Sequence, residues 1–178
     1  MSKSTSTNGT TTVAKKIGKK LIPKGVKKKL VNTLQKKGKK ESQTTFKYTD
    51  KSPGQPKLVP IFEALKALLL PYEKGEMKVH GGTGGTISLI NHRPLVIDGR
   101  KKPAMWFAGA MVQKGFVGFY FMCVYMNEPL KKRINPELLK CLKGKACFHI
   151  KKDDPVIYGQ IEEALKMGFA DFRKRGWV

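Results

Sequence analysis

Two cysteines and a histidine near the C-terminus are the residues best suited to bind a metal ion or act as a nucleophile. They are Cys141, Cys147 and His149. Zinc sites usually present cysteines in close pairs such as C-x2-C, whereas five residues separate these two cysteines. Cys147 and His149 would share a face of a strand, but a fourth ligand would have to come from His80 or His92. Because cysteine is usually a buried apolar residue, we predict no metal site and no cofactor.

The same residues are also the candidates for a cysteine–histidine nucleophile, which requires a base beside the thiol. No surrounding pattern marks Cys123, Cys141 or Cys147 as activated, and no loop resembles an oxyanion-binding site. We therefore predict that the protein has no catalytic residues and is not an enzyme.

Two pairs of adjacent acids, Asp153-Asp154 and Glu162-Glu163, are the only carboxylate pairs in the second half of the chain. Hard cations such as iron or calcium require clustered carboxylates. Adjacent acids on a helix point to different sides, and we expect both pairs at helix beginnings, where negative charge is favoured. The pairs therefore predict helix starts and no metal site.

A glycine-rich run, His80 to Thr86, resembles the loops that bind phosphate. Such loops need a helix directly after the glycines, whose amides and dipole meet the anion. The residues that follow, Ile87 to Ile90, have the alternation of a strand. The run therefore predicts a mobile hairpin loop.

The strongest feature of the composition is positive charge. The 178 residues include 36 Lys+Arg and 13 Asp+Glu, a formal net charge of +23. Such a surplus attracts polyanions, with an attraction that weakens as salt rises. Residues 1–57 hold sixteen lysines and two acidic residues, a net charge of +14, and residues 58–178 hold the other +9. The first third of the chain therefore carries most of the charge.

We predict that residues 1–57 form a disordered lysine-rich tail and linker that contacts nucleic acid without sequence specificity. The first arginine is Arg93, and lysines without arginines suit phosphate contact rather than base readout. Two further basic clusters, 131–133 and 173–175, lie in the domain. The lysines expected to contact polyanions are Lys15, Lys16, Lys19, Lys20, Lys27, Lys28, Lys29, Lys36, Lys37, Lys39 and Lys40.

Binding of residues 13–34 to an anionic membrane surface is an alternative, but their apolar stripe is only one residue wide. The longest apolar run, Phe116 to Met126, is too short to span a bilayer. An odd number of cysteines and a polar start without a signal peptide predict a cytoplasmic protein without disulfide partners.

Residues 58–178 are predicted to fold as one domain. Helical spacing of apolar residues follows Pro60, and Pro136-Glu137 and Val156 begin two further predicted helices. The order of elements predicts an antiparallel sheet packed against helices, an α+β fold. The expected strands are 75–79, 86–90, 94–97, 104–111, 115–125 and 146–150. The turn at 91–92 is expected to join the second and third of these, and the loop after Asp98-Gly99 is expected to exceed two residues.

An aromatic set in the central strands allows two interpretations. A domain of this size needs large apolar residues inside, so core packing is the first. The second is the lining of a small-ligand pocket, which would make the protein a small-ligand or metal-binding protein. The set consists of Trp106, Phe107, Phe116, Phe119, Tyr120, Phe121 and Tyr125.

Four segments carry a resemblance to a known family: NPELLK at 135–140, LKGKACFHI at 142–150, WFAG at 106–109 and GFVGFY at 115–120. Over residues 58–177 the chain resembles the YdhG-like domain family, a family of unknown function. The resemblance implies two core strands, a leucine-containing helix, a glycine turn, a short strand and a closing helix. One branch of the family is described as a frataxin-like iron chaperone, which implies iron binding as an alternative. The scattered acids and the positive charge of this chain argue against that activity.

Overall fold

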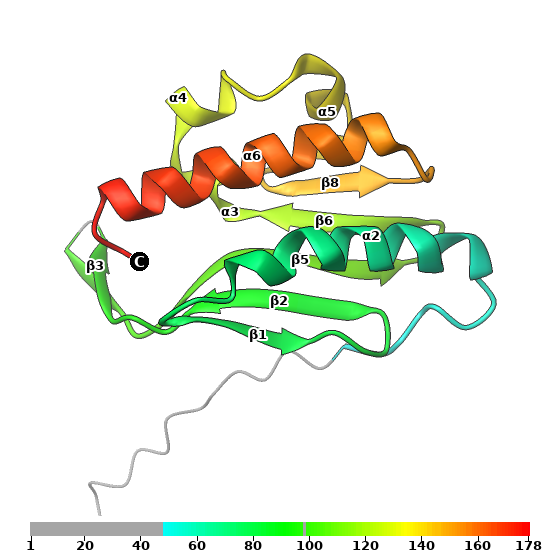
Figure 1. Cartoon of the computed structure of the whole chain (residues 1–178), viewed down its shortest axis with the longest axis horizontal. Coiled ribbons are helices and arrows are strands. Elements are labelled where there is room, and N and C mark those ends of the chain that lie inside the picture. The colour runs from blue at the N-terminus through cyan, green and yellow to red at the C-terminus, as the bar shows by residue number, and fades with distance from the viewer. Residues whose placement is uncertain (1–47, 98) are drawn as a thin grey trace, which may run out of the picture. The chain divides into compact units, whose positions relative to one another are not determined.

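The computed structural model describes residues 48–97 and 99–178 (Figure 1). The eleven tail lysines, and the disorder predicted around them, lie outside these residues. Within the described part of the chain, every helix is too short or too polar to cross a membrane.

The centre of the domain is an antiparallel six-stranded sheet with the strand order β1-β2-β5-β6-β8-β7. Helices pack on it, so the predicted α+β class is confirmed. Its strands are β1 (Met77–Gly81), β2 (Thr86–Asn91), β5 (Met105–Gln113), β6 (Phe116–Phe121), β7 (Leu142–Lys143) and β8 (Cys147–Ile150).

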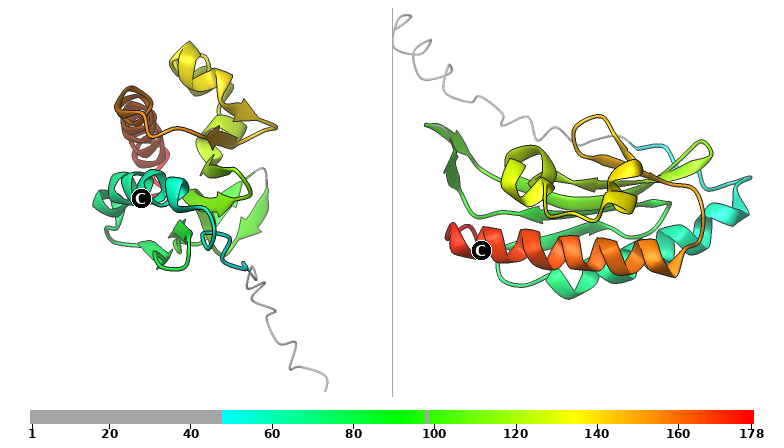
Figure 2. Two further views of the ribbon diagram at one scale, coloured as in Figure 1. Left: turned by 90° about the vertical axis from the view of Figure 1, so that its right-hand side faces the viewer. Right: turned by 90° about the horizontal axis from the view of Figure 1, so that it is seen from above.

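Two helices, α2 (Val59–Leu69) and α6 (Pro155–Lys174), lie side by side over one face of the sheet (Figures 1 and 2). Their apolar residues recur at helical spacing and are buried, such as Ile61 and Leu65 on α2 and Leu165 on α6. The sheet contributes four of the five fully buried phenylalanines in this core, Phe107, Phe119, Phe121 and Phe148, and α6 contributes the fifth, Phe172.

The last predicted residues of the strand 115–125 form a helix instead. β6 ends at Phe121, and α3 (Met122–Met126) follows directly. Ladder pairing supports a strand only where a neighbour exists, and β8 begins at Cys147, opposite Tyr120. An apolar run alone does not distinguish a buried strand from a buried helix. The continuous apolar sequence therefore did not indicate that the strand ends and a helix begins after Phe121. Two more short helices, α4 (Glu128–Lys131) and α5 (Pro136–Lys140), follow near α6 (Figure 2).

The strand expected at 94–97 was predicted to pair with its predecessor, and this was wrong. β3 (Leu95–Ile97) pairs instead with β4 (Arg100–Lys102) in a separate two-stranded sheet. The partner of β2 in the main sheet is β5. Only two positions separate β3 from β4, and the second, Gly99, has a φ of +73°. The loop is thus a two-residue hairpin, shorter than predicted, because residues 100–102 continue the pairing.

The chain packs on the domain from Tyr48, ten residues before the expected start. The Tyr48 hydroxyl donates to the carbonyl of Val112 at 2.8 Å. The Gln55 side chain accepts from the Gly115 amide at 2.6 Å and donates to the Gln113 carbonyl at 3.2 Å. The described part of the predicted linker is therefore hydrogen-bonded to the end of the sheet at the β5–β6 turn.

Candidate nucleic-acid interface

The face of the sheet opposite α2 and α6 carries no helix among the described residues (Figure 2). Side chains alternate along a strand, so residues paired directly across neighbouring strands share a face. The pairs Ile90–Trp106, Gly109–Tyr120 and Tyr120–Cys147 place their members on this face, as does Gly118–His149. We call it the open face.

The Trp106 and Tyr120 rings stack on the open face, with centroids 5.2 Å apart and planes at 29°. The indole Nε1 donates to the Ala108 carbonyl at 2.7 Å, which fixes the ring against β5. Gly109 makes room for it, since a β-carbon there would lie 2.9 Å from Cζ2 of Trp106. Both rings are half-buried, so part of each remains accessible.

A second stacked pair joins β6 and β8. The Phe116 and His149 rings lie with centroids 3.8 Å apart and planes at 12°. Between the two pairs is Gly118, where a β-carbon would lie 3.1 Å from Cε2 of Tyr120 and 3.3 Å from the Cys147 sulfur. We call Trp106, Tyr120, Phe116 and His149 the aromatic patch.

All four rings of the aromatic patch are uncharged near neutral pH. Burial, with the neighbouring Cys147, raises the pKa of Tyr120 to about 12. Burial and the charges of Lys151 and Lys143 lower the pKa of His149 below its ordinary value. Uncharged π faces are the surfaces on which other flat rings stack.

Charge is distributed unevenly between helices and strands. Helices α2 to α6 contain six acidic and six basic residues, whereas no strand in the described part of the chain contains an acid. Five ion pairs occur among the described residues, each between positions three or four apart on one helix or its end. The strand cations are Lys78, Arg100, Lys101, Lys102 and Lys143, all exposed and none of them in those pairs. The helices therefore carry equal numbers of acidic and basic residues. The described strands carry only basic ones, Lys78 and Lys143 in the six-stranded sheet and the other three on β4.

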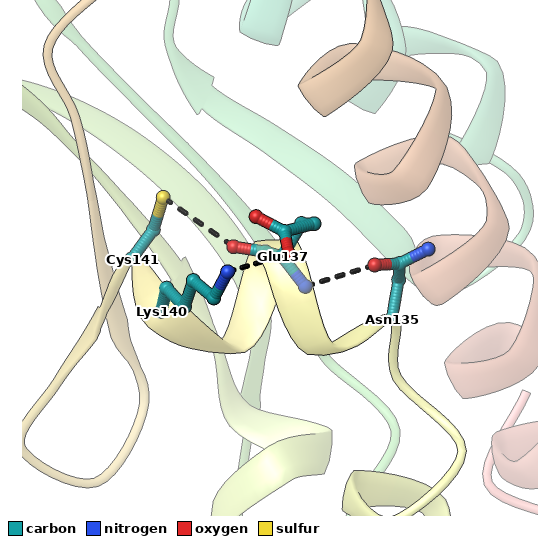
Figure 3. A network of polar contacts seen from close by, with 4 residues as sticks. All are labelled: Asn135, Glu137, Lys140 and Cys141. Atoms are coloured by element: carbon teal, nitrogen blue, oxygen red, sulfur yellow. Dashed lines mark hydrogen bonds and ion pairs between the residues drawn. The ribbon is translucent and has the colours of Figure 1, made fainter.

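Cys147 and His149 share the open face, as their spacing predicted, but they make different contacts. His149 stacks on Phe116, while Cys147 lies beside the Tyr120 hydroxyl. Cys141 follows α5, and its thiol points to the Glu137 carbonyl at 4.0 Å (Figure 3). Among residues 48–97 and 99–178, no three His, Cys, Asp or Glu side chains are grouped as metal ligands would be.

Burial raises the pKa of all three cysteines, Cys123, Cys141 and Cys147. A thiol with a raised pKa is protonated at neutral pH, and the thiolate is the reactive form. None of the three therefore has the electrostatic surroundings of an activated nucleophile.

His80 and His92, considered above as additional ligands, contact each other instead. Their Nε2 atoms are 2.8 Å apart, and both side chains are exposed. One imidazole donates and the other accepts across this contact. The structure thus separates the histidines into two groups, one at β1 and one at β8.

The glycine run forms the loop between β1 and β2, so the predicted hairpin is confirmed. Asp50 lies against it, with Oδ1 2.8 Å from the position that a β-carbon of Gly85 would take. Hydrogen bonds from the Ser52 side chain and amide lower the pKa of Asp50. A carboxylate held in its charged form repels phosphate, so this loop is a poor phosphate site.

One of the two acidic pairs lies at a helix start, as predicted, and the other does not. Asp154 caps α6 by accepting from the Val156 amide at 2.9 Å, and Asp153 accepts from the Tyr158 hydroxyl at 2.9 Å. Glu162-Glu163 lie well inside α6, where Glu162 pairs with Lys166 at 2.7 Å. Helix α6 begins at Pro155, so this pair is beyond the first turn.

The two basic clusters of the domain meet in space. Arg133, which follows α4, and Lys174, at the end of α6, line one open groove of about 550 Å³. Its other lining residues include Asp171, which is paired with Arg175 at 2.7 Å. The groove is mixed in charge, unlike the open face.

The predicted aromatic set divides between the two faces of the sheet. Core packing was correct for Phe107, Phe119 and Phe121, which are fully buried. It was wrong for Trp106, Phe116 and Tyr120, which lie half-buried on the open face, and for Tyr125, which is 55% exposed on α3. The signal was the alternation itself, because Gly109 and Gly118 mark strand positions where a neighbouring ring takes the space of a side chain.

Comparisons of the chain with models of protein families, with curated proteins and with solved structures gave no match.

Proposed function

We propose that the protein is a non-enzymatic module that binds nucleic acid through electrostatic contacts to phosphate. The observation that carries the proposal is the separation of charge: the helices carry as many acidic as basic residues, most of them in local ion pairs, whereas no strand among residues 48–97 and 99–178 contains an acid. Residues 1–57 add a net charge of +14 to the same chain. Cations without local partners are those able to replace the counterions of a polyanion.

The contacts are assigned to two groups of lysines. The eleven tail lysines at positions 15–40 provide the larger, sequence-independent share of the affinity, and strand cations such as Lys78 and Lys143 provide the rest. Because a free thiol suits a reducing compartment, the three free cysteines support a cytoplasmic location.

Membership of the YdhG-like family is part of the proposal. The order of α5, a glycine turn at Gly144, β8 and the closing helix α6 is the order that the resemblance implies. The family carries no activity over to this chain, so it supports the architecture of a binding module and nothing more specific.

The test compares the full-length chain with a variant in which the eleven tail lysines are replaced by glutamine. Fluorescence anisotropy with a labelled 20-base-pair duplex at 50 to 200 mM salt gives the affinity and its salt dependence. We expect the logarithm of the affinity to fall linearly with the logarithm of salt. The slope should decrease by about 0.9 for each phosphate that the variant no longer neutralises.

Two results would overturn the proposal. One is a wild-type affinity that does not depend on salt. The other is binding to anionic lipid vesicles that is tighter than binding to nucleic acid at equal salt, which would indicate a membrane-surface protein.

A further inference from the structure

We infer that the aromatic patch on the open face is a stacking platform for the bases of single-stranded nucleic acid. The inference rests on the proposed function and deepens it, since it adds a site and a preference for single strands. The lysines contact phosphates on any nucleic acid, whereas the patch contacts bases that are free of a duplex.

The geometry of the patch is suited to unpaired bases. Trp106 with Tyr120, and Phe116 with His149, form two stacked pairs on adjoining strands. Phe116 and Tyr120 are four residues apart on β6, which corresponds to about 13 Å along a strand. Every base has a π face, so stacking on such rings tolerates any sequence. Bases in a duplex are already stacked on each other and cannot reach a flat sheet.

The patch is also held in place before any ligand binds. The Trp106 indole is fixed by its hydrogen bond to Ala108, and Gly109 and Gly118 leave the space that the rings occupy. A rigid aromatic surface loses little conformational entropy on binding. Half-buried rings without a helix above them, within the described residues, are the kind of apolar surface that marks a binding site.

The charges around the patch select a polyanion as its occupant. Lys151 and Lys143 lie near His149, and Lys51 donates to the Gln113 side chain at 2.7 Å at the other end of β5. Lys78 lies on the same face of β1, and no strand of the sheet contributes an acid. A second copy of this chain would bring like charges together, whereas a phosphate backbone beside the rings is complementary.

The test measures binding of the full-length chain to labelled 20-nucleotide poly-U RNA, poly-dT DNA and a 20-base-pair duplex at 100 mM salt. The variant Trp106→Leu/Tyr120→Leu removes one ring pair, and Tyr125→Leu is the matched control, since Tyr125 is an exposed aromatic on helix α3 and not on a strand. We expect affinity for both single strands to fall at least ten-fold in the double variant. Duplex affinity, and all affinities of the control, should change less than two-fold.

A second measurement does not depend on the stability of the double variant. In the Trp177→Phe variant, Trp106 is the remaining tryptophan. Titration of this variant with poly-U or poly-dT is expected to quench its fluorescence, because a stacked base contacts the indole. Titration with the duplex should leave the fluorescence unchanged.

The outcomes separate this inference from the function on which it rests. If the wild type binds none of the three probes, the proposed function fails. If the wild type binds them but Trp106 is not quenched, or the double variant keeps its affinity for single strands, only the stacking platform is overturned. A wild-type dimer that dissociates in the double variant would also overturn it, since a second copy would then occupy the open face.

Discussion

A β-carbon at Gly168 would lie 2.5 Å from Cζ of Phe121, closer than any real contact allows. Gly168 is on α6 and Phe121 ends β6, so this glycine sets how closely the helix approaches the sheet. Cys123 is also near, with its sulfur 2.9 Å from the same position. The Phe121 ring is fully buried.

The substitution Gly168→Ala is therefore expected to destabilise the domain by about 1–2 kcal/mol, since overpacking outweighs the gain in helix propensity. Gly159→Ala on the same helix is the matched control, because nothing lies within 4 Å of its β-carbon position. It should stabilise the protein by about 0.5–1 kcal/mol. Urea unfolding measures the change in the free energy of unfolding for each variant. Changes of equal sign and size in the two variants would contradict the assigned helix–sheet contact.

Asn91 is the only buried polar residue among the described residues, and its side chain ties the C-terminus to β2. Its Nδ2 donates to the Trp177 carbonyl at 2.7 Å, and its Oδ1 accepts from the Arg93 amide at 3.0 Å. Asn91→Ala should lower the free energy of unfolding by about 1–3 kcal/mol, because both partners lose a hydrogen bond. The exposed cap Asn135, which accepts from the Glu137 amide at 2.9 Å, is the comparison. Its replacement by alanine should cost about 1 kcal/mol.

The segment 48–57 is expected to contribute to stability, which a free linker would not do. Tyr48→Phe removes the donor to the Val112 carbonyl, and Gln55→Ala removes the hydrogen bonds to the β5–β6 turn. Each should destabilise the full-length chain by about 0.5–1.5 kcal/mol in thermal or urea unfolding. Unchanged stability in both variants would show that the segment does not hold the end of the sheet.

The pKa of His149 is expected to be below its ordinary value in the folded protein, because burial and Lys151 and Lys143 disfavour the charged ring. The unfolded chain then binds the proton first, at about pH 6.5. The contribution of His149 to the free energy of unfolding is therefore highest above that pH. It is lost as pH falls through the folded-state pKa, because the unfolded chain takes up the proton more readily. An NMR titration of the His149 ring measures the value, and Lys143→Gln/Lys151→Gln should raise it. A folded-state pKa at or above the ordinary one would contradict the assignment.

Much of the fold was predictable from local patterns. The stripe that includes Ile61 and Leu65 predicted α2, and the alternation after the glycine run predicted β2, because each reflects which face of an element is buried. The pairing of β3 was not predictable in this way. Its partner β4 is a short run of three cations, Arg100 to Lys102, whose composition does not resemble a strand.

The aromatic patch shows the same limit for the candidate site. The types and order of Trp106, Phe116 and Tyr120 were evident, but their assignment to the core ignored the face on which each lies. That assignment depends on the register of β5 against β6, which pairs Gly109 with Tyr120. A shift of one residue would exchange the two faces.

The sequence by itself determined the charge of this protein, its α+β class and the residue types of its central strands, because these follow from composition and local periodicity. Only the tertiary structure decided that the helices would cover one face and leave four rings on the other. This outcome depends on which segments meet across the sheet, and contacts between residues distant in sequence leave no periodic signal along the chain.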